Sequence, residues 1–347
     1  MVPDTMQAVV LTGHGGLEML AFRDDVPVPD PGAGDVLVRV DACGLNNTDI
    51  WTREAAYGDD AGWQGTLDFP IIQGADIAGE IVDVGADVSA DRLGQRVLVD
   101  NALYAEAPTA FGSLVNADLI GSERDGGYAE YAAVPAENAH HIESSLSAAE
   151  LATFPTAYVT AERMLNRGNV GSGDDVFVTG ASGGVGTGLI QLACRRGARV
   201  LALTSSGKAA AVRDLGADEV VARDETAVPT AIDNWTHDGS VDVVADVVGG
   251  ELFQAFLERL RPGGRLVTAG AVAGAVTEVD LRTVYLNQIE IVGSTMGTRS
   301  EFADLVGYIE DGDIEPVLAE TYPLNEIHDA QRQFVRSDYV GNIVVEP

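Results

Sequence analysis

Four glycines between positions 180 and 186 carry the clearest chemical signal in this sequence of 347 residues. They stand in Val176–Gly186, VFVTGASGGVG, between an apolar segment and the helical spacing of Leu189–Ala193. A strand that turns on glycine into a helix aims backbone N–H groups and the positive helix end at one point, where a pyrophosphate fits. An alanine replaces the first glycine of the usual G-x-G-x-x-G pattern, so the signal depends on this strand–helix context. The residues predicted to hold the pyrophosphate are Ala181, Gly183, Gly184, Val185 and Gly186.

The next predicted strand, Arg199–Leu203, runs into hydroxyl side chains and the only lysine of the chain. Sites for NAD usually place an acidic residue here, about twenty residues past the glycines, to bind the ribose diol. Hydroxyls and an ammonium group suit a phosphate monoester instead, which predicts NADP(H) as the cofactor. The alternative is that the lysine only occupies the first turn of a solvent-facing helix. The residues predicted to surround the 2′-phosphate are Thr204, Ser205, Ser206 and Lys208.

Three later strands supply the remaining cofactor candidates. Ligands of parallel sheets bind at the carboxyl ends of the strands, so residues just past those ends are expected beside the crevice. The last group would border the nicotinamide. For each residue taken singly, a role in a turn or in sheet-end packing is an equally good interpretation. These candidates are Val248, Gly249, Gly270, Ala271, Ser294, Thr295 and Met296.

Two patterns of elements must position these residues. Residues 1–150 read as strand-rich, with apolar or alternating runs separated by turn clusters. The pattern changes near Ser147, because Ser147 and Glu150 form a capping-box sequence that opens a helix. The strands predicted in the first region are Gln7–Leu11, Val36–Val40, Ile77–Val84 and Arg96–Val99.

After the glycine loop, strands and helices alternate, which predicts a doubly wound parallel sheet. Arg261–Gly264 is expected to break the last helix before its strand. The tail should add two helices and a strand that returns to the first region. The predicted strands are Arg199–Leu203, Glu219–Ala222, Val241–Val248, Arg265–Ala269, Glu290–Val292 and Asn342–Val345. The predicted helices are Ala157–Leu165, Lys208–Leu215, Thr230–Asn234, Leu252–Leu260, Glu301–Ile309 and Glu326–Phe334.

The amino-acid composition limits the classes of partner that this protein can bind. With 21 basic and 54 acidic side chains, the formal net charge of −33 opposes binding to nucleic acid or to anionic membranes. Acidic excess with almost no lysine resembles cytoplasmic proteins of halophiles. There is no signal-peptide pattern and no apolar run long enough to cross a bilayer, so a cytoplasmic location is expected. The two cysteines, Cys43 and Cys194, cannot form a disulfide framework or a four-thiolate zinc site.

The whole chain resembles the medium-chain dehydrogenase/reductase superfamily. The landmarks are Cys43–Asp49 (CGLNNTD), Gly74–Gly79 (GADIAG), Gly127–Tyr131 (GYAEY), the glycine loop and the closing Gly341–Val345 (GNIVV). The resemblance implies a GroES-like catalytic domain, residues 1–155 and 298–347, around an inserted Rossmann domain, residues 156–297. It also implies a homodimer or homotetramer, with dimers formed by pairing the edge strand Glu290–Val292.

The resemblance also bears on the metal. Zinc alcohol dehydrogenases of this family hold their catalytic zinc with Cys, His and Cys, and these positions are Cys43, Ala75 and Thr156 here. Only Cys43 and, at most, Asp76 remain as ligands, whereas a catalytic zinc takes three from the protein. We therefore expect no metal. Lys208 matches the cofactor lysine of the zinc-free quinone oxidoreductase-like branch, while Asn342 stands where that branch has a second lysine.

Residues for chemistry without a metal lie in the first landmark. Asn46 matches an asparagine that zinc-free members place near the nicotinamide, and Thr48 matches a proton-relay hydroxyl of alcohol dehydrogenases. Either could also act as the N-cap of a helix at Asp49–Glu54. Asp49 is a third candidate, acting by orienting this helix. Cys43, Tyr57, Trp63, Tyr128 and Thr156 are candidates for the substrate pocket, together with loops 54–70 and 101–125.

Three functions remain open at this stage. The first is an NADPH-dependent reductase of quinones or α,β-unsaturated carbonyls, because conjugated acceptors spread the developing charge and need less Lewis-acid help. The second is a medium-chain alcohol or ketone dehydrogenase that uses Thr48 and another donor in place of a metal. The third is an NADPH-binding protein of low turnover, which would tolerate the loss of Asn46 and Thr48.

Overall fold

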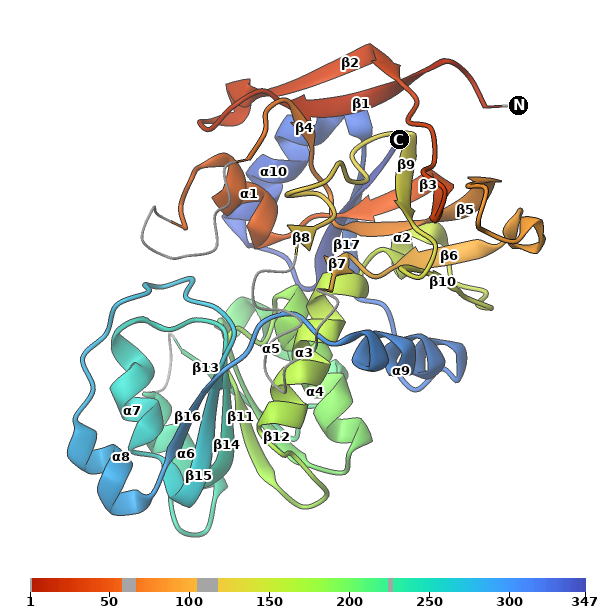
Figure 1. Ribbon diagram of the computed structural model, residues 1–347. Helices are drawn as coiled ribbons and strands as arrows, with labels where there is room; N and C mark the ends of the chain where they lie inside the picture. The colour runs from red at the N-terminus through yellow and green to blue at the C-terminus, as the bar shows by residue number, and fades with distance from the viewer. Residues whose placement is uncertain (1, 58–66, 105–117, 224–226) are drawn as a thin grey trace.

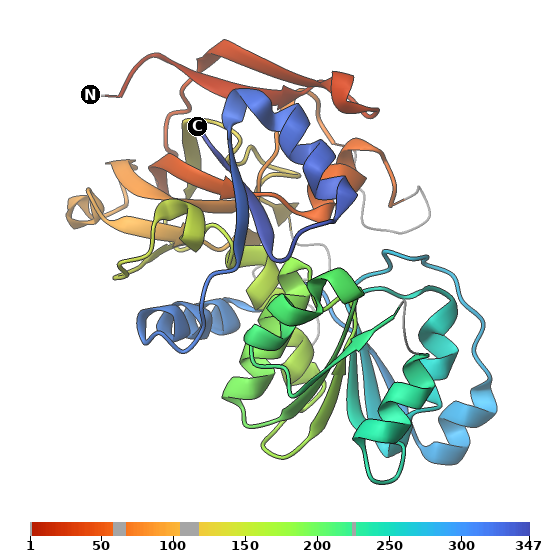
Figure 2. The ribbon, with the colours of Figure 1, turned by 180° about the vertical axis from the view of Figure 1, so that it is seen from behind.

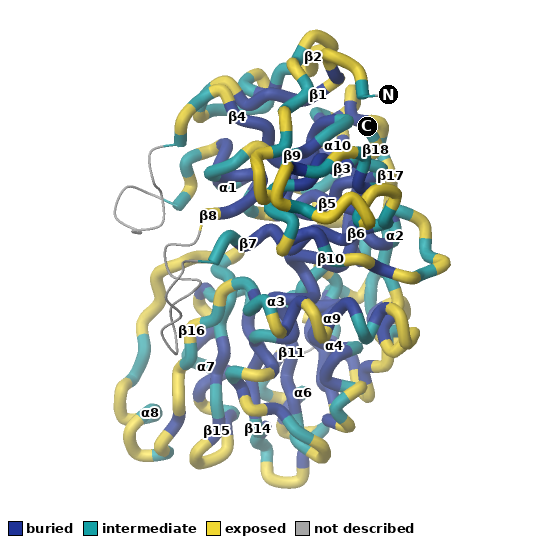
Figure 3. Tube along the Cα trace, turned by 45° about the vertical axis from the view of Figure 1, so that its right-hand side comes forward, coloured by how far each residue is buried: buried dark blue, intermediate teal, exposed yellow. Residues whose placement is uncertain are grey.

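The computed structural model describes residues 2–57, 67–104, 118–223 and 227–347 and has two parts (Figure 1). A strand-rich part holds both ends of the chain, and a parallel-sheet part lies below it in this view. Buried backbone runs through the sheets of both parts, and exposed residues gather at turns and outer helices (Figure 3). Within these residues, no helix is long and apolar enough to cross a membrane.

The parallel-sheet part is built on six strands in the order β13-β12-β11-β14-β15-β16. Val176 and Val178 of β11 pack on one side with α3 and α4, whereas Phe177 packs on the other with α6 and α7. Helices therefore cover both faces, as a doubly wound sheet requires. The strands are β11 (Asp175–Val178), β12 (Arg199–Thr204), β13 (Glu219–Ala222), β14 (Val241–Asp246), β15 (Leu260–Thr268) and β16 (Glu290–Gly293). The helices are α3 (Pro155–Arg167), α4 (Gly184–Arg195), α5 (Ala209–Asp214), α6 (Val228–Trp235), α7 (Phe253–Leu257) and α8 (Leu281–Asn287).

The strand-rich part centres on β3 (Asp35–Gly44), which pairs with β5 (Asp76–Val84), β9 (Tyr131–Pro135) and β18 (Asn342–Glu346). The antiparallel pairing of β18 with β3 confirms that the tail returns to the first region. The other strands are β1 (Thr5–Leu11), β2 (Leu20–Pro27), β4 (Ile71–Ile72), β6 (Arg96–Val99), β7 (Ala102–Leu103), β8 (Asp118–Leu119), β10 (Ala139–His141) and β17 (Leu318–Pro323). The helices are α1 (Asn47–Arg53), α2 (Ala148–Leu151), α9 (Arg299–Glu310) and α10 (Ile327–Arg336). Short 3₁₀ turns span Leu17–Met19, Ala90–Arg92, Ser206–Lys208, Gly250–Leu252 and Leu324–Glu326.

Two connections join the parts. Ser147 caps α2 as its sequence predicts, and the chain then enters α3 at Pro155. After β16 it leaves through α9, whose Phe302 and Leu305 belong to the same hydrophobic core as α3. Near the other end, Gly341 forms a parallel bridge with Gly183, so the approach to β18 touches the glycine loop (Figure 2). The domain boundaries 1–155, 156–297 and 298–347 stay a prediction.

One predicted helix end is wrong. The helix predicted at Leu252–Leu260 ends at Leu257, and Leu260 already begins β15. The segment expected to break the helix, Arg261–Gly264, lies inside that strand instead. The reason is tertiary: β15 pairs with β14 from Leu260 onward and absorbs the extra residues at a shift of register. The predicted elements do not include β2, β4, β7, β8, β17 or α8.

Candidate active site

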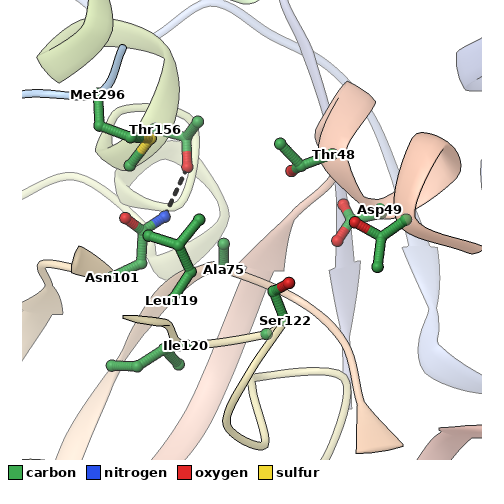
Figure 4. Close-up of a pocket in the computed structure, with 11 residues that line it drawn as sticks. Thr48, Asp49, Ala75, Asn101, Leu119, Ile120, Ser122, Thr156 and Met296 are labelled. Atoms are coloured by element: carbon green, nitrogen blue, oxygen red, sulfur yellow. Dashed lines mark hydrogen bonds between the residues drawn. The ribbon is translucent and has the colours of Figure 1, made fainter. Parts of the chain in front are cut away.

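A small pocket lies where the two parts meet (Figure 4). Hydroxyl, amide and apolar side chains line it, and the atom-free space, partly open to solvent, is about 310 Å³. Thr156 comes from the start of α3, Met296 from the segment after β16, and the rest from the strand-rich part. The lining residues are Thr48, Asp49, Thr52, Ala75, Asn101, Leu119, Ile120, Gly121, Ser122, Thr156 and Met296.

The start of α1 brings Thr48 and Asp49 to this pocket. One carboxylate oxygen of Asp49 accepts the backbone N–H of Asn46 at 2.7 Å and the hydroxyl of Tyr128 at 2.8 Å. Burial raises the pKa of Asp49 to about 6, and these hydrogen bonds limit the rise. Asp49 thus fixes the first turn of α1 and, with it, the position of Thr48. The Asn46 side chain is buried, and its Nδ2 has no hydrogen-bond partner among the described residues.

A second buried carboxyl, Asp76, lies behind the pocket and holds Thr156. Its Oδ1 accepts the backbone N–H of Thr156 at 3.0 Å and the Thr156 hydroxyl at 2.5 Å. The Thr156 hydroxyl in turn accepts Nδ2 of Asn101 at 2.7 Å. Burial raises the pKa of Asp76 to about 7, and the hydrogen bonds from Thr156 limit the rise. This carboxyl is therefore poised to exchange a proton near neutral pH.

The residues at the predicted metal positions do not form a ligand set for zinc. Ala75 lines the pocket without a donor atom, and Thr156 is engaged by Asp76 and Asn101. Cys43 is fully buried, and burial raises the pKa of its thiol. Among the described residues, no group of three His, Cys, Asp or Glu side chains could hold a metal ion.

The glycine loop joins β11 to α4 in the geometry of a phosphate cradle. Gly180 has a φ of 59°, which side-chain-bearing residues rarely adopt. A Cβ on Gly186 would lie 2.2 Å from the Gly180 carbonyl oxygen, so only glycine fits there. A Cβ on Gly183, at the N-cap of α4, would meet only that same oxygen at 3.6 Å. Space is therefore kept open in front of the helix N-terminus, where an anion fits.

The predicted 2′-phosphate residues follow at the end of β12. Lys208 is partly buried, and its ammonium group donates to the Ser337 carbonyl and lies 3.4 Å from the Ser182 hydroxyl. Thr204 is buried, and its hydroxyl has no hydrogen-bond partner among the described residues. Nδ2 of Asn342, beside Gly184, is a second buried polar atom without a hydrogen-bond partner among the described residues. These polar atoms fit a ligand that would complete their hydrogen bonds.

The later strand ends also converge at this edge of the sheet. The Asp246 carboxylate accepts the N–H groups of Val248 and Gly249, each at 3.0 Å, and so ends β14 two residues before the predicted limit. Gly270 and Ala271 follow β15. Ser294, Thr295 and Met296 follow β16, and Met296 reaches the pocket with an unusual φ of 39°. The Ser294 hydroxyl is another buried group without a partner in the described chain.

Not every predicted pocket residue lines the pocket. Cys43 and Tyr128 are fully buried behind it, and Tyr128 acts on Asp49. The Tyr57 ring packs edge-on against Trp51 at 5.6 Å between centroids. Trp63 and much of loops 54–70 and 101–125 lie outside the described residues. The ends of the second loop are described, and they supply Asn101 and Leu119 to Ser122.

Sequence reasoning missed two polar residues. Asn101 follows the end of β6 by two residues, but nothing local distinguishes it from an ordinary turn asparagine. Arg223 follows the end of β13, beside the predicted phosphate site. That second residue could have been found, because the strand after the one carrying Thr204 ends at the same edge of a parallel sheet.

Two family models match the sequence. "Alcohol dehydrogenase GroES-like domain" matches residues 32–144, and "Zinc-binding dehydrogenase" matches residues 184–311. The chain belongs to the medium-chain dehydrogenase/reductase superfamily, and it has the GroES-like and Rossmann-type domains of that family. The predicted fold class is thereby confirmed.

Known relatives are oxidoreductases of several kinds. The rat (Rattus norvegicus) quinone oxidoreductase is 29% identical over 341 residues, 96% of this chain and 94% of the relative. A crystal structure from Sinorhizobium meliloti 1021, described as a candidate alcohol dehydrogenase, shares 50% identity, a TM-score of 0.95, and 100% and 98% coverage of the two chains. The 2-octenoyl-CoA carboxylase reductase CinF, solved with NADP and 2-octenoyl-CoA, shares 28% identity and a TM-score of 0.88, over 100% and 88% of the chains. This protein is thus similar to enzymes with different substrates, and the shared property is oxidoreductase activity.

Proposed function

We propose that this protein is a cytoplasmic, zinc-independent oxidoreductase that uses NADPH to reduce a quinone or an α,β-unsaturated carbonyl compound. The observation that carries the proposal is the replacement of a metal-ligand set by neutral donors. Ala75 and Thr156 stand at ligand positions, and Thr156 is tied into hydrogen bonds with Asp76 and Asn101. A pocket of this kind can hold an oxygen atom by hydrogen bonds but offers few ligands to a metal.

The hydroxyl groups would act on the substrate oxygen. Thr48 and Thr156 line the same pocket, one from α1 and one from α3 (Figure 4). As negative charge develops on the substrate oxygen, Thr48 holds it by a hydrogen bond, and the hydroxyl relays a proton from solvent, taking up one proton as it gives one to that oxygen. Asp49 positions Thr48 through α1, and Asp76 with Asn101 orients the Thr156 hydroxyl. The conjugation of a quinone or enone spreads the developing charge, so donors weaker than a metal ion suffice.

The cofactor site is formed by the glycine loop and the strand ends of the parallel sheet. When bound, the nicotinamide cofactor supplies the hydride. Gly183 leaves room for the pyrophosphate, and the Lys208 ammonium group offers charge to a 2′-phosphate. Buried hydroxyls of Thr204 and Ser294 and the amide of Asn342, which lack partners in the described chain, provide hydrogen bonds. The relative solved with NADP supports the choice of phosphorylated cofactor.

A homodimer is part of the proposal. Exposed apolar side chains gather on α8, β16 and the segment before them, with Leu286 at 68%, Tyr285 at 63% and Ile291 at 44% exposure. The strand β16 ends the sheet, so its outer edge has no partner strand among the described residues. A second copy of the chain pairing at this edge would cover these residues. Leu286→Asp should convert a dimer to a monomer in light scattering, whereas a monomeric wild-type protein would contradict the assignment.

The function is tested on the purified protein. NADPH and NADH oxidation is measured against a benzoquinone, an enal, a saturated ketone and an alcohol, with metal content determined on the same sample. We expect turnover with NADPH and the conjugated acceptors that a chelator does not change. Stoichiometric zinc with turnover confined to alcohols would favour the alcohol dehydrogenase assignment. Tight NADPH binding without turnover on any acceptor would favour a binding protein.

A further inference from the structure

Arg223 lies next to the predicted 2′-phosphate residues although it is distant from them in the sequence. The strand β13 runs parallel to β12, with Ala222 opposite Thr204. The backbone N–H of Arg223 then donates to the Thr204 carbonyl at 2.9 Å. Arg223 therefore leaves the sheet beside the turn that carries Ser205, Ser206 and Lys208. Its side chain is exposed at this edge of the sheet.

Two cations share this place. Desolvation is the main cause that lowers the pKa of Lys208, and the positive charge of Arg223 lowers it further, against the Asp338 carboxylate. Within the described chain, neither cation has a carboxylate at ion-pair distance, although acidic side chains outnumber basic ones 54 to 21. By contrast, Arg213 on α5 lies 3.9 Å from Glu219 at the other end of β13. Two cations placed together favour an anionic ligand between them.

The two cations differ in what they can offer. The Lys208 ammonium group already donates to the Ser337 carbonyl, which fixes its position. Arg223 has a planar guanidinium that can donate two parallel hydrogen bonds to phosphate oxygens. The Thr204 carbonyl accepts the Arg223 N–H, and the buried Thr204 hydroxyl, which has no partner among the described residues, adds a neutral donor. Together these groups match a dianionic phosphate monoester.

We propose that Arg223 binds the 2′-phosphate of NADP(H) together with Lys208 and is the residue that sets the preference for NADPH over NADH. This inference rests on the proposed function, because it assumes a phosphorylated nicotinamide cofactor. The hydrogen bonds of a charged group contribute about 1.5–3 kcal/mol, so the loss of Arg223 should weaken binding by about 10- to 100-fold.

The test measures binding of 2′,5′-ADP and of 5′-ADP by calorimetry at one fixed salt concentration, with no turnover required. Arg223→Gln is compared with Arg223→Lys, which keeps the charge, and with Arg213→Gln, which removes a charge at the other end of β13. We expect Arg223→Gln to lose affinity for 2′,5′-ADP but to keep its affinity for 5′-ADP. Arg223→Lys should recover part of the loss, and Arg213→Gln should behave like the wild type. Circular dichroism melting of each variant verifies that it is folded.

The contradicting outcomes are distinct. A wild-type preference for 2′,5′-ADP that survives in folded Arg223→Gln overturns the role of Arg223 and leaves the NADPH assignment standing. An equal loss for both nucleotides also overturns it, because the effect would then not depend on the 2′-phosphate. A wild-type protein that binds 5′-ADP as tightly as 2′,5′-ADP refutes the NADPH assignment itself and the inference with it.

Discussion

The pocket below α1 and the edge of the sheet beyond β12 treat charge in opposite ways. In the pocket, the carboxyls of Asp49 and Asp76 are 98% buried and have no cation beside them in the described chain, while neutral donors face inward. At the sheet edge, Lys208 and Arg223 stand together without a carboxylate at ion-pair distance among the described residues. Burial acts on both regions by favouring the neutral form. It raises the pKa of Asp76 to about 7 and lowers that of Lys208.

The two regions suit different ligand groups, because the pocket holds buried carboxyls and the sheet edge holds more exposed cations. In the pocket, carboxyls that titrate near neutrality hold hydroxyl groups, which suits an oxygen that gains charge only during reaction. At the sheet edge, cations that remain charged suit a ligand that carries its charge permanently. The pocket is therefore suited to a transient charge and the sheet edge to a fixed one.

The largest effect should come from the pocket hydroxyl of Thr48. Thr48→Val removes the hydrogen-bond donor that we propose for the substrate oxygen while keeping the shape of the side chain. We expect kcat/KM to fall by about 10²-fold or more, the range for the loss of one such donor, with NADPH affinity unchanged. Thr48→Ser, which restores the hydroxyl, should recover most of the activity in the same assay. Equal rates for the valine and serine variants would show that the hydroxyl takes no part.

The next effect concerns the cofactor region alone. Gly183→Ala places a methyl group in the open space before α4 without a close protein contact, the nearest atom lying at 3.6 Å. We expect NADPH affinity to fall about tenfold or more, because the backbone can no longer approach the pyrophosphate, with little change in melting temperature. Gly186→Ala is the contrasting variant, since its Cβ would meet the Gly180 oxygen at 2.2 Å and should lower the melting temperature. Unchanged NADPH binding by folded Gly183→Ala would argue against a cradle at this loop.

A third effect is on stability and belongs to the pocket. The pKa of Asp76 rises from 3.8 to about 7, so the folded protein keeps a proton that the unfolded chain has released. The free energy of unfolding therefore falls as pH rises from about 4 to about 7. The fall is on the order of 4 kcal/mol, at about 1.4 kcal/mol per pH unit. Asp76→Asn should flatten this part of the stability–pH curve, measured by urea unfolding. Asp4→Asn, at an exposed position, should leave the slope of the stability–pH curve as in the wild type. The same slope in both variants would mean that folding does not raise the pKa of Asp76.

The smallest expected effect is a difference between the two regions in their response to salt. Raising the ionic strength from about 0.1 to about 1 M shortens the Debye length from about 10 to about 3 Å. Binding of NADPH through Lys208 and Arg223 should weaken several-fold, whereas the KM for an uncharged quinone should change little. Fluorescence titration and steady-state kinetics over the same salt series provide the two readouts. Parallel changes in both would contradict the division into fixed and transient charge.

The sequence predicts features built from residues that are close together in the chain better than features built from distant residues. The glycine loop, the cap at Ser147 and the alternating strands of the sheet are local patterns, and each is present, although β14 ends two residues earlier and β15 begins five residues earlier than predicted. The failure at Arg261–Gly264 arose because pairing with β14 outweighed the tendency of proline and glycine to end structure. The pocket was harder to predict from the sequence, because Thr156 contacts Asn101 and Asp76, which lie 55 and 80 residues away in the chain.

By itself, the sequence determined the fold class, the dinucleotide loop and the absence of histidine and cysteine from two metal positions, because these depend on residue type and short spacing. The tertiary structure decided which groups act together. It placed Asn101 and Asp76 on Thr156, Tyr128 on Asp49, and Arg223 beside Lys208. Burial then set the protonation of those groups, and burial is a property of packing between distant segments.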